Sequence, residues 1–383
     1  MRTDVLVVGG GPAGSTAARL LARKYDVVIA EEHRMPGEPL HCAGLVTRRG
    51  VPSFARGSVI CEVKGARLHS PLGFTLTLEA KGSRACVIDR PLFDRIMFHR
   101  AVDEGATPLL GACARVTVSS LHEVRALLKV EGGTEQVASP LLIGADGYKS
   151  VCRRSAALSP PKHMLTGIQV DLKGVDFDPD FVELYMGKDA APGFFAWAIP
   201  ADDLVRVGLC IWNAVGTPAT YLKKLLSRPM FAKGRKVSLA AGKIPMGVGR
   251  TAVSGRIMLV GDAACHAKPL SGGGVYTGIK GAELAARVAD GFLTSGSPLE
   301  EYDALWKSEF GKELARAFRI RKVFLNLSDK KLDKALRIFS RPGVRNLLEE
   351  QGDLDYPASI SASVLKLAPK LAQFSPQIIK SLL

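Results

Sequence analysis

The sequence has little of what marks disulfide-bonded, metal-binding or membrane-spanning proteins. Its seven cysteines are scattered and none forms a C-x-x-C pair, so they indicate neither a disulfide framework nor a zinc site, and we expect no bound metal. No stretch approaches the roughly 18 consecutive apolar residues of a membrane span. The chain enters an apolar strand almost at once, so we expect no signal peptide and a cytoplasmic location.

Acidic residues are fewer than basic ones. Asp and Glu number 37 against 52 Lys and Arg, which gives a formal net charge of +15. This balance favours an anionic partner, such as a phosphate-bearing substrate, an acidic lipid surface or an acidic protein, although a merely solvated basic surface would give the same balance. No nucleic-acid-binding module accompanies the charge, so we expect no nucleic-acid partner. With 383 residues, the chain is long enough for two domains, or one domain with a large insertion.

The N-terminal stretch carries the most specific pattern in the chain. An apolar strand at residues 5–8 precedes glycines spaced G-x-G-x-x-G, and a helix at residues 13–24 and a strand at residues 26–30 follow. The glycines are Gly9, Gly11 and Gly14, and the second strand ends at Glu31. The first glycine allows a tight turn, the second lets the backbone approach a pyrophosphate, and the third lets helix and strand pack closely. Because a carboxylate at this strand end can accept from ribose hydroxyls, the unit predicts a dinucleotide site.

Two later segments repeat the arrangement of a buried strand followed by a glycine-containing turn. Residues 141–154 read LLIGADGYKSVCRR, an apolar strand stopped by Gly-Ala-Asp-Gly before a short helix. Residues 257–260 predict another strand, Gly261 and Asp262 follow it, and glycines at 272–274 open a long helix. Glycines before a helix N-terminus present backbone N–H groups to a ligand. His266 in this loop has no companion at metal-ligand spacing, so we interpret it as part of the loop structure.

The pattern of elements predicts an α/β fold. We expect a Rossmann-type dinucleotide-binding domain, an antiparallel β-sheet substrate domain and a helical C-terminal region, because short strands separated by turns replace the alternation of strands and helices in the middle of the chain. The expected boundaries are residues 1–162 for the first part of the dinucleotide-binding domain (with a small strand insert at 51–81), 163–250 for the substrate domain, 251–300 for the second part of the dinucleotide-binding domain, and 301–383 for the helical region.

The C-terminal region mixes cations with apolar residues at helical spacing. Its last stretch, VLKLAPKLAQFSPQIIKSLL, carries Lys366, Lys370 and Lys380 among apolar residues. These helices either pack against the domains or rest with a basic amphipathic face on a bilayer, and the sequence leaves both open. The second interpretation predicts peripheral attachment to the inner face of the cell membrane.

The three glycine-containing blocks together resemble the flavoprotein family of aromatic hydroxylases and their relatives. GGGPAG with Glu31 resembles that family's FAD-adenosine site, the Ala145-Asp146-Gly147 segment its DG motif, and VGDAAC…PLSGGGV its GD motif. Within this superfamily the chain is more closely similar to geranylgeranyl reductases. HCAGLV resembles their cysteine-containing loop, and PGFFAWAIP resembles their P-G-x-Y-x-W-x-F-P signature, with Phe195 in place of the Tyr and Ile199 in place of the Phe.

This resemblance implies FAD as the cofactor of a Rossmann-type FAD-binding domain. It places the adenosine and pyrophosphate half at Gly9, Gly11, Ala13, Gly14, Glu31, Arg90 and the backbone near Ala114. It places the ribityl and ring half at Asp262, Gly273, Gly274 and Val275, with Cys42, Ala43 and Gly44 near the flavin ring. We expect Phe195 and Trp197 to bind the substrate in one wall of an apolar pocket.

The resemblance also implies a reaction: FAD-dependent saturation of isolated C=C bonds in geranylgeranyl or other polyprenyl chains, on an archaeal-type glycerophospholipid or a related prenyl lipid. An isolated alkene has no carbonyl to take up charge, so an acid must deliver a proton. His41 and Cys42 are the candidate catalytic residues, and the alternative for Cys42 is a small side chain packed against the flavin.

Other features of the function stay open at this point. No second glycine fingerprint marks a nicotinamide site, so we expect electrons from a transiently docking NAD(P)H or from a small acidic, ferredoxin-like protein. The alternative functions are a flavin monooxygenase or halogenase on the same scaffold, and a non-catalytic prenyl-lipid carrier.

Overall fold

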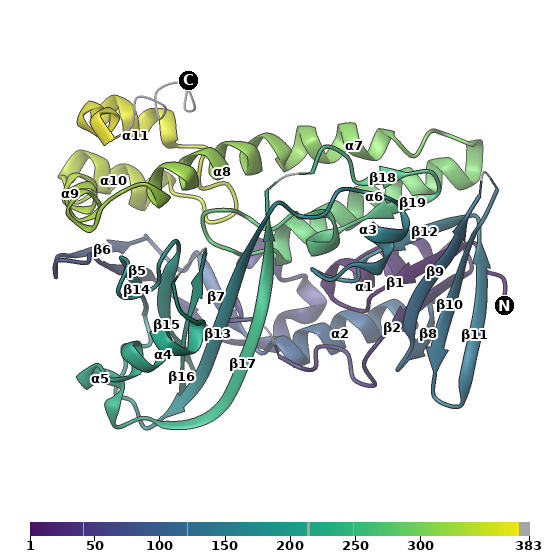
Figure 1. The fold of residues 1–383 in the computed structure, drawn as a ribbon, viewed down its shortest axis with the longest axis horizontal. Helices are drawn as coiled ribbons and strands as arrows, with labels where there is room; N and C mark the ends of the chain where they lie inside the picture. Colours follow the sequence, from purple (N-terminus) through teal and green to yellow (C-terminus); the bar gives the residue numbers. More distant parts are fainter. Residues whose placement is uncertain (41, 121, 213–214, 248, 375–383) are drawn as a thin grey trace.

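A computed structural model describes residues 1–40, 42–120, 122–212, 215–247 and 249–374. The predicted α/β fold is confirmed, with a mainly parallel sheet at one end of the molecule and a large sheet at the other (Figure 1). Of the site residues that the sequence predicts, only His41 lies outside the described residues.

The parallel sheet is built on the N-terminal strand that the sequence predicts. Its strands, in spatial order, are β18 (Val253–Ser254), β19 (Ile257–Leu259), β12 (Leu141–Gly144), β1 (Val5–Val8), β2 (Val27–Glu31) and β8 (Thr107–Leu110). Every neighbouring pair is parallel except β18 with β19. All four residues of β1 are buried, as expected for a continuous apolar strand covered on both faces. The carboxyl ends of β1, β12 and β2 therefore meet at one edge.

Helices cover this sheet, and two of them begin at side chains that cap the helix N-terminus. The covering helices are α1 (Pro12–Leu21), α2 (Arg90–Asp103), α3 (Val151–Ser155) and α6 (Val275–Ser295). The Asp89 carboxylate accepts from the Leu92 N–H at 3.0 Å at the start of α2, and the Ser150 hydroxyl accepts from the Arg153 N–H at 2.9 Å at the start of α3. Helices α1 and α6 lie against each other, which brings two glycine-containing turns together.

Two small sheets and one large sheet complete the β-structure. The small sheets are β11 (Gly133–Ser139), β10 (Val124–Val130) and β9 (Cys113–Ser119), and β3 (Leu45–Thr47), β7 (Ala85–Ile88) and β4 (Val59–Val63). The large sheet has the order β17 (Arg235–Met246), β13 (His163–Lys173), β16 (Leu204–Ile211), β15 (Phe195–Ala201), β14 (Phe181–Met186), β5 (Gly65–His69) and β6 (Thr75–Glu79). Strands β5 and β6 come from the predicted insert and extend this sheet.

The two faces of the large sheet are covered differently. One face is covered by two helices that the sequence analysis does not predict, α4 (Pro218–Leu226) and α5 (Pro229–Ala232). The other face carries an aromatic cluster that includes Phe194 and Trp197. Because side chains alternate along a strand, Ala196 and Ala198 pack under the helices while Trp197 points to the opposite face.

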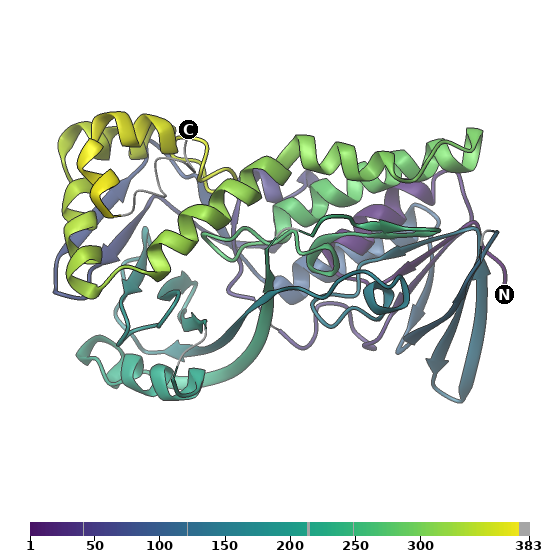
Figure 2. The same cartoon turned by 45° about the horizontal axis from the view of Figure 1, so that its top comes forward.

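The C-terminal region is helical, as predicted. It contains α7 (Glu301–Trp306), a π-helical turn (Lys307–Gly311), α8 (Lys312–Leu325), α9 (Asp329–Phe339), α10 (Pro342–Gln351), α11 (Ser361–Leu367) and a 3-10 segment (Pro369–Phe374). Helices α9 and α10 lie against β6, so this region reaches from the parallel sheet to the far edge of the large one (Figure 2). Within the described residues, no helix combines the length and apolarity needed to cross a bilayer.

Candidate active site

The turn after β1 has the geometry that its glycine spacing predicts. Gly9 has φ +106°, and a Cβ atom on Gly14 would lie 1.8 Å from the Gly9 carbonyl oxygen. Both positions therefore require glycine. A Cβ on Gly11 would meet nothing within 4 Å, so the turn opens into free space in front of the α1 N-terminus. Free N–H groups and the positive end of the helix dipole at this opening fit a pyrophosphate.

The carboxylate of Glu31 is buried at the end of β2 and is held in a fixed orientation. Its Oε2 accepts from the Gly10 N–H at 2.7 Å, and its Oε1 lies 3.0 Å from the His33 amide and 2.7 Å from His33 Nδ1. A carboxylate has about four lone-pair positions, so acceptor capacity remains for ribose hydroxyls. No sequence pattern marks His33. The Glu31 carbonyl accepts from the Ala112 N–H at 2.8 Å, which brings the start of β9, with Ala114, beside this strand end.

The GD motif meets the first turn from the other side. Gly261 has φ +60°, and a Cβ there would lie 3.2 Å from the Ala13 Cβ. A Cβ on Gly274, at the α6 N-terminus, would lie 3.1 Å from Asp262 Oδ1. Burial raises the pKa of the Asp262 carboxyl to about 6, and the positive charge of Arg90 opposes this rise. The structure thus brings Gly261 against Ala13 of α1, and Asp262 against Gly274 at the α6 N-terminus.

The cysteine-containing loop is held between two sheets. The Gly44 N–H lies 3.4 Å from Cys42 Sγ, and the Gly44 carbonyl accepts from the Ile88 N–H at 2.9 Å. The buried Arg206 of β16 donates to the carbonyls of Ala43 and Ile88, each at 3.0 Å. Gly44 has φ +77°, and a Cβ there would lie 2.5 Å from Arg206 Nη1, so a glycine is required. The loop therefore has a fixed position relative to the large sheet.

Arg90 links this loop to the GD motif. Its guanidinium donates to both carboxylate oxygens of the buried Asp94, at 3.0 and 2.9 Å. Burial alone would lower the pKa of Arg90, but Asp94 and the Cys42 side chain raise this pKa by more than burial lowers it, so Arg90 remains charged. Its charge also acts on Asp262. The structure consequently places Arg90 beside Cys42 and near Asp262. Its contact with the adenosine and pyrophosphate half, which we expected from sequence, stays a prediction.

The aromatic residues of the signature segment lie next to the glycine loop before α6. Phe194 and Phe195 stack with ring centroids 4.2 Å apart, and Phe195 meets Trp197 edge-on at 6.2 Å. A Cβ on Gly272 would lie 3.3 Å from the Phe194 ring. Trp197 packs in one apolar cluster with Ala43 of the cysteine-containing loop. The predicted substrate wall thus lies against both the glycine loop and the cysteine-containing loop.

A buried ion pair fixes the glycine loop to the C-terminal region. Lys268 Nζ donates to Asp355 Oδ1 at 2.6 Å, and Thr47 Oγ1 donates to Asp355 Oδ2 at 2.6 Å. The Asp355 side chain has no exposed surface and that of Lys268 is 9% exposed. No local spacing pattern marks this pair or Arg206, because their partners lie far away in the chain. Asp94 was also missed, although it lies one helical turn after Arg90, a spacing that is visible in the sequence.

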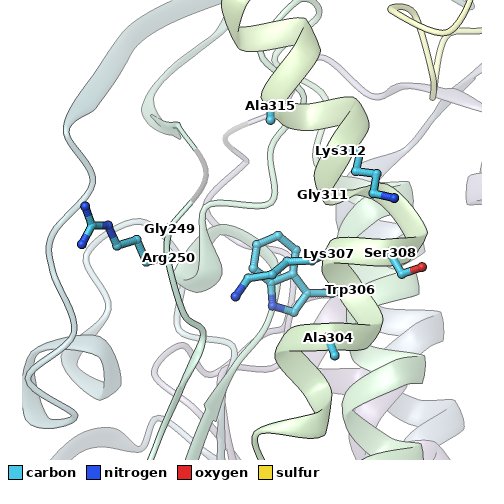
Figure 3. Close-up of a pocket in the computed structure, with 9 residues that line it drawn as sticks. All are labelled: Gly249, Arg250, Ala304, Trp306, Lys307, Ser308, Gly311, Lys312 and Ala315. Carbon is cyan, nitrogen blue, oxygen red and sulfur yellow. The ribbon is translucent and has the colours of Figure 1, made fainter.

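A surface pocket of about 500 Å³ lies elsewhere, between the segment at Gly249 and the π-helical turn. Figure 3 shows Arg250, Ser308 and Lys312 pointing in different directions around it rather than toward one point. No predicted site residue lines this pocket. Within the described residues, no group of three or more His, Cys, Asp or Glu side chains could hold a metal ion.

The fold and the site define an FAD-dependent oxidoreductase. The open glycine turn, the oriented Glu31 and the Asp262 carboxylate at the α6 N-terminus fit the two halves of FAD. The family described as FAD binding domain matches residues 2–224.

Comparison with known proteins narrows the family. A digeranylgeranylglycerophospholipid reductase of Methanothrix thermoacetophila is 30% identical over 357 residues, which cover 88% of this chain and 91% of the relative. The crystal structure of a geranylgeranyl bacteriochlorophyll reductase-like protein from Thermoplasma acidophilum has a TM-score of 0.86 and 27% identity, covering 100% of this chain and 98% of that one. A flavin-dependent brominase, at 16% identity, TM-score 0.76 and coverage of 98% and 100%, shares the fold alone. The chain belongs to the geranylgeranyl reductase family of FAD-dependent flavoproteins.

Proposed function

We propose that this protein reduces isolated C=C bonds in the geranylgeranyl or other polyprenyl chains of an archaeal-type glycerophospholipid or a related prenyl lipid. The observation that carries the proposal is the convergence of the cysteine-containing loop, the glycine loop before α6 and the aromatic wall on one region. An apolar wall beside a redox cofactor suits a hydrocarbon substrate. The reductase names of relatives at about 30% identity support the same chemistry.

The first task of the protein is to bind FAD. We assign the pyrophosphate to the turn at Gly9, Gly11 and Gly14, and the ribose to the Glu31 carboxylate. The half-buried Asp262 would accept hydrogen bonds from the ribityl hydroxyls, and the N–H groups at Gly274 and Val275 would hold the ring half. Arg90, held by Asp94, keeps a fixed positive charge beside this half.

Reduction of an alkene adds a hydride to one carbon and a proton to the other. When bound and reduced, FAD supplies the hydride. We propose that Cys42, from its loop fixed by Arg206, delivers the proton, which solvent then replaces. His41 is the other candidate donor. Phe195 and Trp197 hold the prenyl chain against the ring and exclude water.

We propose a transiently docking electron donor, either an acidic ferredoxin-like protein or NAD(P)H, because the +15 charge favours an acidic partner. We also propose peripheral association with an anionic membrane, since the substrate is a lipid. On the C-terminal tail, Lys366 and Lys370 are exposed, and Lys380 lies outside the described residues.

The test is anaerobic incubation of the dithionite-reduced holoprotein with prenyl lipids, followed by mass spectrometry. We expect products heavier by pairs of hydrogens and concurrent reoxidation of the flavin. Turnover that requires O₂ would instead identify a monooxygenase or halogenase. Lipid binding without reoxidation of the flavin would identify a non-catalytic carrier, and either result would overturn the proposal.

A further inference from the structure

One long segment of the chain contains no acidic residue. Between Asp203 and Asp262 there is no Asp or Glu, while Lys and Arg recur throughout. The structure exposes a group of these cations on α4, α5 and the start of β17. They are Lys223, Lys224, Arg228, Lys233, Arg235 and Lys236. Of these, Lys224 is ion-paired with Asp189 at 2.7 Å.

Large apolar side chains are exposed in the same place. Met230 on α5 is 48% exposed, and Val237 and Leu239 on β17 are 51% and 69% exposed. Leu239 pairs with Val170, which packs under α4 and α5, so Leu239 lies on the face of the sheet that these helices cover; a bulge at Val237 interrupts the alternation there. We name this surface, formed by the six cations with Met230, Val237 and Leu239, the α4–β17 face. It lies at one end of the large sheet, where β17 is the edge strand (Figure 1).

A second copy of this chain does not suit the α4–β17 face. A symmetric dimer places the same patch on both partners, so cations would oppose cations, which is unfavourable. The segment itself supplies no carboxylate to compensate, and the neighbouring Asp189 is already paired with Lys224. An anionic bilayer, in contrast, offers phosphate groups to the Lys and Arg residues and hydrocarbon to Met230 and Leu239. The mixture of basic and apolar groups therefore favours a lipid surface over an acidic protein, which would leave the apolar groups unmatched.

Strand β17 connects this face to the proposed site. Ile244, near its other end, lies close to the glycine loop, because a Cβ on Gly272 would be 3.2 Å from Ile244 Cδ1. Ile244 lies five positions after Leu239, about 17 Å along the strand, and this odd spacing puts the two side chains on opposite faces of the sheet. Docking through the α4–β17 face therefore leaves the glycine loop about 17 Å from Leu239 along the strand, on the other face of the sheet.

We propose that the α4–β17 face is the surface through which this protein docks on anionic phospholipid bilayers. The inference rests on the proposed function, because that function places the lipid substrate in the bilayer. It differs from attachment through the C-terminal tail, since the docking surface is then part of the substrate sheet itself.

The test measures binding of the holoprotein to phosphatidylcholine vesicles with and without phosphatidylglycerol. Each basic residue near an anionic surface strengthens binding about fivefold. The affinity of K233Q/K236Q for anionic vesicles should therefore fall about 25-fold. The single variant L239S should also weaken vesicle binding, because it removes an apolar contact, and should leave the salt dependence of binding unchanged. Flavin absorbance and far-UV circular dichroism verify that each variant is folded.

Two charge-matched controls locate the effect. K366Q/K370Q removes two cations from the tail, and R115Q/K129Q removes two from the small sheet of β9 and β10; all four side chains are exposed. We expect both to bind within about twofold of the wild type. A larger loss in K366Q/K370Q than in K233Q/K236Q would overturn the proposal in favour of the tail. Equal losses of affinity in all three double variants would mean that net charge alone determines vesicle binding, and this result would also overturn the proposal.

A second measurement separates this proposal from the proposed function. Prenyl reduction is assayed on detergent-solubilised lipid, where no bilayer is needed, and K233Q/K236Q should retain wild-type activity there. If the wild type binds vesicles as expected but reduces no solubilised lipid, the proposed function fails and the docking surface stands. If K233Q/K236Q keeps vesicle binding but shows a raised KM for an acidic ferredoxin-like donor, the face is a protein-docking surface and the proposal is wrong.

Discussion

Replacing Asp355 by asparagine tests how the C-terminal region holds the active site. The Asp355 carboxylate is fully buried and accepts from Lys268, Thr47 and Arg49, the last at 3.1 Å. Lys268 begins the glycine loop, whose own bonds run from the Lys268 N–H to the Gly273 carbonyl at 2.9 Å and from the Gly272 N–H to the Lys268 carbonyl at 2.8 Å. One carboxylate thus anchors the glycine loop and the strand that follows the cysteine-containing loop.

The expected loss of stability follows from the buried charge that the substitution leaves unpaired. In D355N, the Lys268 ammonium stays buried without a counterion, and removal of one partner from a buried ion pair destabilises a protein by about 3–5 kcal/mol. The amide can still accept from Thr47, so we expect a value near the lower limit, about 3 kcal/mol. FAD binding should also weaken, because the loop before α6 loses its anchor.

The assay is urea unfolding of the FAD-depleted protein, together with titration of FAD by flavin fluorescence. The control is D189N, which breaks the exposed pair with Lys224 and should change stability by less than about 1 kcal/mol. K268M/D355L removes both buried charges and should recover part of the stability that D355N loses.

Near-equality of D355N and D189N in these unfolding curves would refute the reasoning, since it would mean that Lys268 does not depend on Asp355 for its charge. A double variant less stable than D355N would also contradict it, because removing an uncompensated buried charge must be favourable.

Three further outcomes are expected. In E31A, loss of charge-assisted hydrogen bonds to the ribose, each worth about 1.5–3 kcal/mol, should weaken FAD binding at least tenfold in a fluorescence titration, and unchanged affinity would contradict the ribose assignment. FAD affinity should fall as the pH drops through about 6, because burial raises the pKa of Asp262 and the free protein then binds a proton. That proton must leave before the carboxylate can accept hydrogen bonds from the ribityl hydroxyls. D262N should bind FAD weakly at every pH, and a wild-type affinity that stays constant from pH 5 to 7 would contradict the assignment. In C42A, prenyl reduction should be lost while bound FAD remains reducible, with C42S intermediate; near-normal reduction by C42A would eliminate the thiol as the obligatory acid and leave His41 or a bound water.

The cofactor half of the site was predictable because its signals are local. The requirement for glycine at Gly9 and Gly14 arises from a positive φ and a 1.8 Å approach within one turn, and both follow from neighbours in the sequence. Strand β1 is a continuous apolar run, and Asp262 directly follows another such strand. The fold class, FAD and the family were confirmed on this basis, whereas the individual site residues stay predictions.

Other residues gave no signal that local reasoning could use. Arg206 holds the cysteine-containing loop from a residue 163 positions away, and its sequence context is that of an ordinary buried strand. Helices α4 and α5 were missed because they are short and interrupt a run of strands. Nothing in the local sequence of β17 marks its exposed apolar residues, so only the sheet order reveals that they stand on an edge.

By itself, the sequence determined the elements whose backbone is constrained by adjacent residues: the glycine turns, the strands before them and the capped helix starts. The tertiary structure decided which distant charges meet, such as Lys268 with Asp355, 87 residues apart. It also decided which apolar residues remain exposed on the α4–β17 face. The physical reason is that turn and helix geometry depend on local sterics and hydrogen bonds, whereas a buried ion pair or an exposed edge depends on how whole sheets and helices pack.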